Sequence, residues 1–234
     1  MAANMNNVAY TDEYQKDRAE YEDQLFRVAA FVDEEHHRLT DELTRKTKNF
    51  FWHQEDYAHH PCSQNEIINS SGDILYSYSS VDSSAGFCKV FAHSNGKEYA
   101  VFSRELYGYS VLDLSSMQDF HYIPAESFAP FGEMHGETFI WCDVHYNRQN
   151  NLLAVEGCFW AYPYSVLLVD FTNPMQDAPQ IDVNGFINKD PDDYVGIDFA
   201  AWDNTDLVLS VYGEDGVKIT VKQEEYLEWF KNAV

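Results

Sequence analysis

Short apolar runs separated by polar turns fill the chain from residue 50 onward. Runs rich in Val, Ile, Leu, Phe and Tyr alternate with Ser-, Asn- and Gly-rich stretches such as residues 63–72 and 80–86. This pattern is typical of β-strands joined by turns. It predicts strands at residues 73–80, 87–92, 98–104, 109–115, 138–146, 152–158, 165–171, 194–201, 206–212 and 216–222, followed by a short helix at residues 223–234.

Residues 12–48 carry a different pattern, in which apolar positions recur three, four or seven residues apart. These positions are Tyr14, Tyr21, Leu25, Val28, Val32, Leu39 and Leu43. The spacing places them on one face of a helix, and Thr11 is a suitable N-cap. We therefore predict a long amphipathic N-terminal helix. The chain then divides into residues 1–49, which carry this helix, and residues 50–234, a single β domain of three to four repeats.

The β region contains a three-fold internal repeat. Residues 89–114, 143–171 and 198–221 each read as a short strand, a polar turn, an apolar strand, a turn with Tyr or Trp, and a further strand. Aligning Tyr99, Leu152 and Leu207 gives repeat spacings of 53 and 55 residues. Regular spacing on this scale is typical of propellers, solenoids and repeat arrays. We expect a mainly β protein of antiparallel, blade-like repeats.

Two repeats end a strand on an aspartate, Asp113 in VLDL and Asp170 in LVDF. This resembles the strand-final Trp-Asp position of WD40-type β-propeller blades, and the resemblance covers residues 89–221. The repeat departs from that family because it lacks the Trp-Asp and Gly-His signatures and is longer than 40–45 residues. The resemblance implies a binding scaffold. Because a propeller needs at least four blades, a propeller-like ring and a meandering sheet both remain open.

The formal net charge of −24 narrows the choice of partners. Residues 49–187 contain only four cationic side chains, those of Lys89, Lys97, Arg104 and Arg148. Binding to nucleic acids or to anionic membranes depends on Lys and Arg that neutralise phosphates. We therefore expect no direct contact with nucleic acid or membrane, and the charge favours a basic protein partner.

The cysteines and the first residues of the sequence are used to predict the cellular compartment. The four cysteines form no CxxC motif, and residues 1–17 lack a basic segment followed by an apolar run. No stretch approaches the 18 consecutive apolar residues of a membrane span. We therefore expect no signal peptide, reduced thiols and a cytoplasmic location.

Residues 52–62 (WHQEDYAHHPC) hold the densest set of metal-ligand side chains, with His53, His59 and His60 as weak candidates. Their spacing matches no zinc template, so we expect neither a metal nor another cofactor. Hydrolase and phosphate-loop motifs are also missing from the sequence. Adjacent polar pairs, such as Asp143 with His145, are common in any chain of this length. Enzymatic activity stays open, and a non-catalytic role is favoured.

Aromatic residues cluster in the turns of the repeats. They are Tyr107, Tyr109, Phe159, Trp160, Tyr162, Tyr164 and Tyr212. Superposed repeats would bring these turns to one edge, where exposed aromatic rings resemble the centre of a protein interface. The alternative interpretation is that the rings fill the space between neighbouring repeats.

We therefore expect a non-catalytic macromolecule-binding protein that engages a basic partner through an acidic surface and an aromatic edge. One alternative is an enzyme or a small-ligand or metal binder with a site where the repeats converge. Another is a structural subunit that assembles through the N-terminal helix, in which residues 25–32 are apolar nearly all round. A homo-oligomer is compatible with either alternative.

Overall fold

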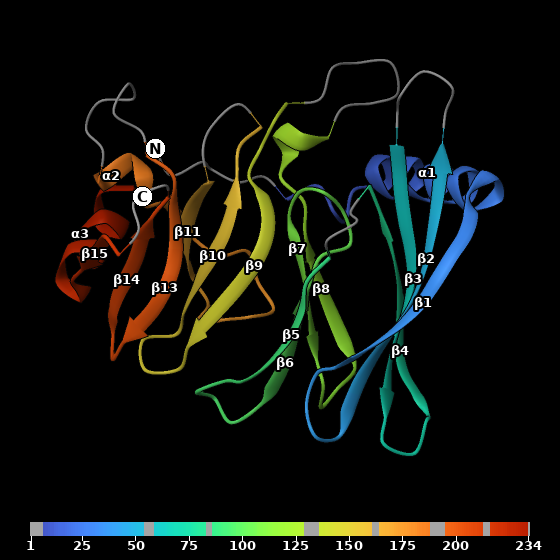
Figure 1. Cartoon of the computed structure of the whole chain (residues 1–234), viewed down its shortest axis with the longest axis horizontal. Coiled ribbons are helices and arrows are strands. Elements are labelled where there is room, and N and C mark those ends of the chain that lie inside the picture. The colour runs from blue at the N-terminus through green and yellow to red at the C-terminus, as the bar shows by residue number, and fades with distance from the viewer. Residues whose placement is uncertain are drawn as a thin grey trace.

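Four antiparallel sheets follow one another in chain order and make up most of the molecule (Figure 1). The structure is a computed structural model that describes residues 7–53, 59–82, 86–128, 136–160, 164–187, 195–212 and 216–233. In each sheet, consecutive strands pair with one another, so every sheet is a simple meander. The predicted fold class, mainly β with blade-like antiparallel repeats and a helix near each end of the chain, is confirmed.

The first two sheets contain four strands each. The first sheet consists of β1 (Ala30–Arg38), β2 (Leu43–His53), β3 (His59–Asn69) and β4 (Ile74–Val81). The second consists of β5 (Cys88–Ala92), β6 (Glu98–Phe102), β7 (Tyr109–Asp113) and β8 (Gln118–Tyr122).

The third sheet again has four strands and the fourth has three. The third contains β9 (Ile140–Asn147), β10 (Leu152–Cys158), β11 (Tyr164–Asp170) and β12 (Gln180–Asp182). The fourth contains β13 (Ile197–Asp203), β14 (Asp206–Val211) and β15 (Lys218–Val221). The helices are α1 (Asp12–Val28), the single turn η1 (Ala125–Ser127), α2 (Asn184–Ile187) and α3 (Gln223–Ala233). None of the helices in these ranges has both the length and the apolar character needed to cross a membrane.

The hydrophobic core lies between neighbouring sheets. Phe102 and Leu112 of the second sheet pack with Ile67 and Tyr78 of the first. A larger cluster joins the second and third sheets, and another joins the third and fourth sheets with Tyr226 of α3. Each interior sheet is therefore covered on both faces. Burial of apolar area at about 25 cal/mol per Å² makes these contacts the main source of stability.

The four sheets form a row in the part of the chain that the structure describes. The first sheet, with α1 beside it, lies at one end of the long axis, and the fourth sheet, with α3, lies at the other end (Figure 1). Between the propeller-like and meandering alternatives, the structure shows blade-like meanders without closure into a ring. The sequence predicted three to four repeats. The structure contains a fourth, which precedes the other three in the chain and forms the first sheet.

Left-handed backbone conformations mark equivalent turns of the repeat. Gly96, Asn151 and Asn204 each have φ between 54° and 86° and precede the second strand of the second, third and fourth sheets. Glycine and asparagine adopt such values at low cost. The sequence repeat of residues 89–221 therefore corresponds to a repeat of turn geometry as well as of strands.

The long helix predicted for residues 12–48 is wrong beyond Val28, because β1 and β2 occupy the remainder. The helix ends where Ala29 adopts an extended conformation with φ −69° and ψ 137°. Farther on, the Thr40 hydroxyl accepts hydrogen bonds from the backbone N–H groups of Glu42 and Leu43, at 3.2 and 3.0 Å, and closes a tight turn. The four-residue spacing of Leu39 and Leu43 thus spans a turn between strands.

The predicted boundary between residues 49 and 50 falls inside β2, so residues 30–49 belong to the first sheet. All ten predicted strands are present, with ends that differ by up to three residues, and the C-terminal helix is present as α3. The strands β3, β8 and β12 were not predicted. β3 carries the polar residues Ser63, Gln64 and Asn65, which made its sequence resemble a loop.

Candidate functional site

Trp160 and Tyr107 are the two predicted aromatic residues that the fold brings together. The Trp160 side chain is 60% exposed, and its Nε1–H donates a hydrogen bond to the Tyr107 hydroxyl at 2.7 Å. Tyr107 forms an isolated antiparallel bridge with Ile140, which links the second and third sheets. Burial raises the pKa of the Tyr107 phenol, so at neutral pH it is a neutral hydrogen-bond partner. The ring of Trp160 is thus fixed at one edge and open to solvent on its surface.

The other predicted aromatic residues are distributed along the row. Tyr109 is only 1% exposed and stacks on Trp141 at 4.4 Å, so it is part of the core and offers no surface to a partner. Phe159 packs edge-on against Phe139. Tyr164 and Tyr212 are exposed on the third and fourth sheets. Tyr162 lies outside the described residues.

A cleft of about 710 Å³ separates α1 from the loop that follows β6. We call it the helix cleft. Its lining includes Asp17, Glu20 and Tyr21 from α1, and Glu105 and Tyr107 from the second sheet. The exposed ring of Trp160 forms part of its wall.

A second cleft, of about 680 Å³, lies against the first sheet, and we call it the strand cleft. The side chains of Asp33, Glu35 and Phe51 contribute to it from β1 and β2. Asp82, Leu106 and Trp160 line both clefts. The two clefts therefore meet at Trp160.

Acidic side chains dominate the two clefts. Six carboxylates line them, those of Asp17, Glu20, Asp33, Glu35, Asp82 and Glu105. The only Lys or Arg residues in the described lining are Arg18 and Arg45. Arg18 pairs with Glu105 at 2.8 Å and with Glu22 at 2.5 Å, and Arg45 donates to the carbonyl of Gly86 at 2.8 Å. Both guanidinium groups are thus engaged, and the clefts have an excess of negative charge.

Buried polar contacts fix α1 to the loop that follows β6. Arg18 is buried, and the Tyr14 hydroxyl donates to the same Glu105 carboxylate that Arg18 contacts. Burial acts against the charge on Arg18, but Glu105 and Glu22 more than offset it and raise the pKa of Arg18. Burial and the Glu105 charge also raise the pKa of Tyr14. The helix that forms one wall of the helix cleft is therefore held by charged hydrogen bonds as well as by apolar packing.

Of the histidines considered as metal ligands, His60 has a structural role. Its Nδ1 lies 3.0 Å from Asp82 and 3.2 Å from the Tyr21 hydroxyl, and its ring stacks on Trp52 at 5.1 Å. Tyr21 also donates to Asp82 at 2.7 Å. His53 and His59 are paired across β2 and β3, and the side chain of His59 lies outside the described set. The structure therefore uses His60 to connect α1 with the first sheet.

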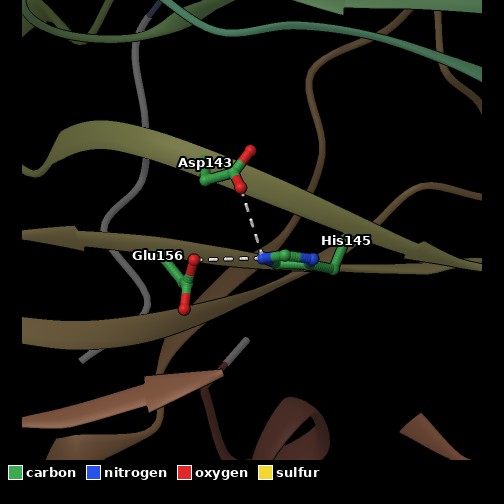
Figure 2. A group of neighbouring side chains, drawn as sticks. All are labelled: Asp143, His145 and Glu156. Atoms are coloured by element: carbon green, nitrogen blue, oxygen red, sulfur yellow. Dashed lines mark hydrogen bonds and ion pairs between the residues drawn. The ribbon is translucent and has the colours of Figure 1, made fainter. Parts of the chain in front are cut away.

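A group of three possible metal ligands lies elsewhere, on the third sheet (Figure 2). Asp143 and His145 are two residues apart on β9, and Glu156 is directly opposite Asp143 on β10. Because side chains alternate along a strand, all three point to one face. The Nε2 atom of His145 is 3.0 Å from Glu156 and 3.7 Å from Asp143. Each of the three residues is partly buried.

The sequence alone suggested only part of these sites. Trp160 and Tyr107 were identified as aromatic turn residues, but the acids that face them come from α1, β1 and the end of β4. Those acids look like ordinary surface charges until the sheets are placed. Likewise, Asp143 and His145 were dismissed as an isolated pair. An antiparallel register that pairs residues 143 and 156 would have revealed Glu156 as the third member.

Comparisons of the chain with models of protein families, with curated proteins and with solved structures find no match.

Proposed function

We propose that the protein binds a basic segment of another protein in the helix and strand clefts, without catalysing a reaction. The observation that carries this proposal is the position of Trp160, whose exposed ring lies where two acidic clefts meet. An exposed tryptophan in clefts whose described lining holds more carboxylates than Lys and Arg side chains is suited to a ligand that is cationic and partly apolar.

Arginine and lysine side chains match this lining chemically. A guanidinium placed over an indole ring gains about 0.5–1 kcal/mol at an exposed site and more when it is desolvated. Carboxylates beside the ring add charge-assisted hydrogen bonds, which are about twice as strong as neutral ones. Asp33 and Glu35 are exposed, and their described partners are side chains of the same sheet: Asn49 donates to Asp33 at 2.8 Å, and His37 lies 2.8 Å from Glu35. Among the described residues neither carboxylate is paired with Lys or Arg, so a cationic partner can approach both.

Strand β1 supports an extended conformation for the bound segment. It is the edge strand of the first sheet, and all nine of its residues are exposed. Phe31 and Val32, at 59% and 58% exposure, add apolar surface at its start. A strand added to this edge would satisfy free backbone groups and set alternate side chains beside Asp33 and Glu35. The resemblance of the repeats to WD40-type blades agrees with a scaffold role.

The charge pattern of β1 argues against a second copy of this chain as the occupant. A two-fold antiparallel pairing centred on Glu34 would place Asp33 opposite Glu35 and Glu34 opposite itself. Like charges directly opposite one another destabilise a sheet. A basic strand makes the opposite contacts, so it fits this edge better than a copy of β1. If the chain instead self-associates through residues 25–32, a measurement of its oligomeric state would reveal this.

Fluorescence anisotropy with a labelled nonapeptide of alternating arginine and valine tests the proposal. The peptide matches β1 in length and presents arginine on one face when extended. We expect binding that weakens steeply between low and high salt, because the attraction involves exposed charges. A nonapeptide of alternating glutamate and valine should not bind. Trp160→Ala should weaken binding about tenfold or more, as is typical when an interface aromatic is lost.

A charge-matched pair of variants separates the clefts from the general acidity of the protein. Asp33→Asn with Glu35→Gln removes two charges from the strand cleft, and Glu224→Gln with Glu228→Gln removes two exposed charges from α3. The proposal predicts a large loss of affinity for the first double variant and little change for the second. Equal losses in both would show that the peptide responds only to net charge and would overturn the proposal.

A further inference from the structure

The Asp143, His145 and Glu156 side chains form a set of donors that is independent of the Trp160 clefts. One imidazole nitrogen and two carboxylate oxygens can be chosen that all lie within 4.8 Å of one another. Imidazole and carboxylate together suit zinc and other first-row transition ions. Figure 2 shows the Nε2 atom of His145 facing both carboxylates from the middle of the group.

The distances between the donor atoms indicate that small rotamer changes would let all three side chains coordinate one ion. Donor atoms about 2.0–2.2 Å from a tetrahedral zinc ion lie roughly 3.3 Å from each other. The observed separations from His145 Nε2, 3.0 Å to Glu156 and 3.7 Å to Asp143, bracket this value. Three protein donors leave a fourth position for water, which is the arrangement of open zinc sites.

Neighbouring groups hold two of the donors in place. The backbone N–H of Phe199 on β13 donates to Glu156 Oε1 at 2.9 Å, which leaves Glu156 Oε2 to face His145. The Phe199 ring stacks on the imidazole at 4.0 Å. Such outer contacts orient metal ligands and raise affinity. The fourth sheet therefore presets a site carried by the third.

The surroundings also have a negative charge in excess. Asp198, next to Phe199 on β13, adds a further carboxylate near Glu156. Lys89 is the cation that meets this group, with its Nζ 2.7 Å from Asp143. A divalent ion would satisfy the carboxylates more fully than one ammonium group, but it must compete with Lys89 for Asp143.

We propose that Asp143, His145 and Glu156 form a binding site for a divalent first-row transition ion, zinc being an ion that imidazole and carboxylate donors suit, at the junction of the third and fourth sheets. The ion binds the Nε2 lone pair of the neutral His145 imidazole, whose one N–H proton is then on Nδ1, and draws the Asp143 carboxylate away from Lys89. It thereby links β9 to β10. The proposal does not depend on the peptide-binding role of the Trp160 clefts.

Isothermal titration with zinc chloride, after dialysis against a chelator, tests the proposal on the whole chain. We expect one strong site per chain and an increase in melting temperature when zinc is present. His145→Ala and Glu156→Gln should each weaken this site at least about tenfold, since each removes a donor. His37→Ala, at an exposed histidine on β1 that pairs with Glu35, is the matched control and should leave the affinity unchanged.

Lys89→Met gives a result of opposite sign. Because this substitution removes the ammonium group that competes for Asp143, it should strengthen zinc binding. If Lys89 had only a structural role, its loss would not strengthen zinc binding. Circular dichroism checks that each variant is folded, and Glu156→Gln substitutes for His145→Ala if the latter does not fold. Zinc binding that persists in both donor variants, or no binding by the unmodified chain, would overturn the proposal.

Discussion

The third sheet and the first sheet use the same meander for different purposes. In the third sheet, six of the seven residues of β11 are buried or partly buried, and Val166, Leu168 and Val169 are completely buried. In the first sheet, β1 is exposed along its entire length. The third sheet lies between two neighbours, whereas the first lies at the end of the row (Figure 1). Position in the row decides which sheet forms core and which offers surface.

The interior of the first sheet is also more polar than that of the third. The Thr47 hydroxyl donates to Asn65 Oδ1 at 2.9 Å, and the Asn65 amide donates to Ser63 at 2.9 Å and to Ser80 at 3.3 Å. All four residues are buried and lie beside the strand cleft. A hydrogen-bonded interior is compatible with a nearby cleft, because it does not rely on complete exclusion of water. Most of the stability therefore comes from the central sheets. The proposed binding surface lies on the first sheet, at the end of the row.

The largest difference between the two regions should appear on truncation of a core residue. Leu168→Ala removes a completely buried side chain between the third and fourth sheets and leaves a cavity. We expect the free energy of unfolding to fall by about 2–5 kcal/mol. Val32→Ala, on exposed β1, should change it by less than about 0.5 kcal/mol. Urea denaturation of both variants measures the contrast, and similar losses would contradict it.

The pH dependence of stability tests the region beneath α1. Burial and the Arg104 charge lower the pKa of His121 to about 4, from 6.5. Between these pH values the unfolded chain binds the proton and the folded chain does not, so stability rises with pH from about 4 to 6.5. The full effect is on the order of 3 kcal/mol. His121→Gln should remove this part of the slope of unfolding free energy against pH, and an unchanged slope would show that His121 is protonated in the fold.

A smaller effect is expected in the polar interior of the first sheet. Thr47→Val keeps the shape of the side chain but leaves the Asn65 carbonyl without its donor. An unsatisfied buried acceptor costs about 1–3 kcal/mol. We expect a loss near the lower end, because the strand cleft gives water access to the site, and thermal unfolding with circular dichroism measures it. No loss, or a gain, would mean that the network contributes nothing to the stability of this sheet.

The smallest effect on stability should come from Trp160→Ala. The ring is mostly exposed and its one described hydrogen bond goes to Tyr107. The free energy of unfolding should change by less than about 0.5 kcal/mol, while affinity for the arginine–valine nonapeptide falls. A loss of stability that accompanies the loss of binding would instead assign Trp160 to the joint between the second and third sheets.

The contrast between the buried interior sheets and the exposed first sheet also explains which strands could be predicted from the sequence. Except for β8 and β12, the strands of the second to fourth sheets were found because packing on both faces demands apolar runs such as residues 165–171. The strands β1 and β3 were missed because they lie in the end sheet and carry charges and amides. Leu39 and Leu43 then fitted a helical spacing by coincidence, since no glycine or proline marks the turn between them.

The candidate sites were less accessible than the fold. Trp160 was found as a turn aromatic, but its meeting with Asp82 and with the acids of α1 and β1 depends on contacts between separate sheets. Glu156 joins Asp143 and His145 only through the register of β9 and β10. Local patterns carry no information about such long-range contacts, so both sites required the three-dimensional structure.

Hydrogen–deuterium exchange with and without a saturating amount of the arginine–valine nonapeptide tests the central claim most directly. The outward amides of β1 are unpaired in the described structure, so a strand added there should slow their exchange. We predict new protection in residues 30–38 and in α1, with exchange in β9–β12 unchanged. Protection confined to the third and fourth sheets, with β1 exchanging as before, would contradict the proposal that the acidic end of the row is the binding surface.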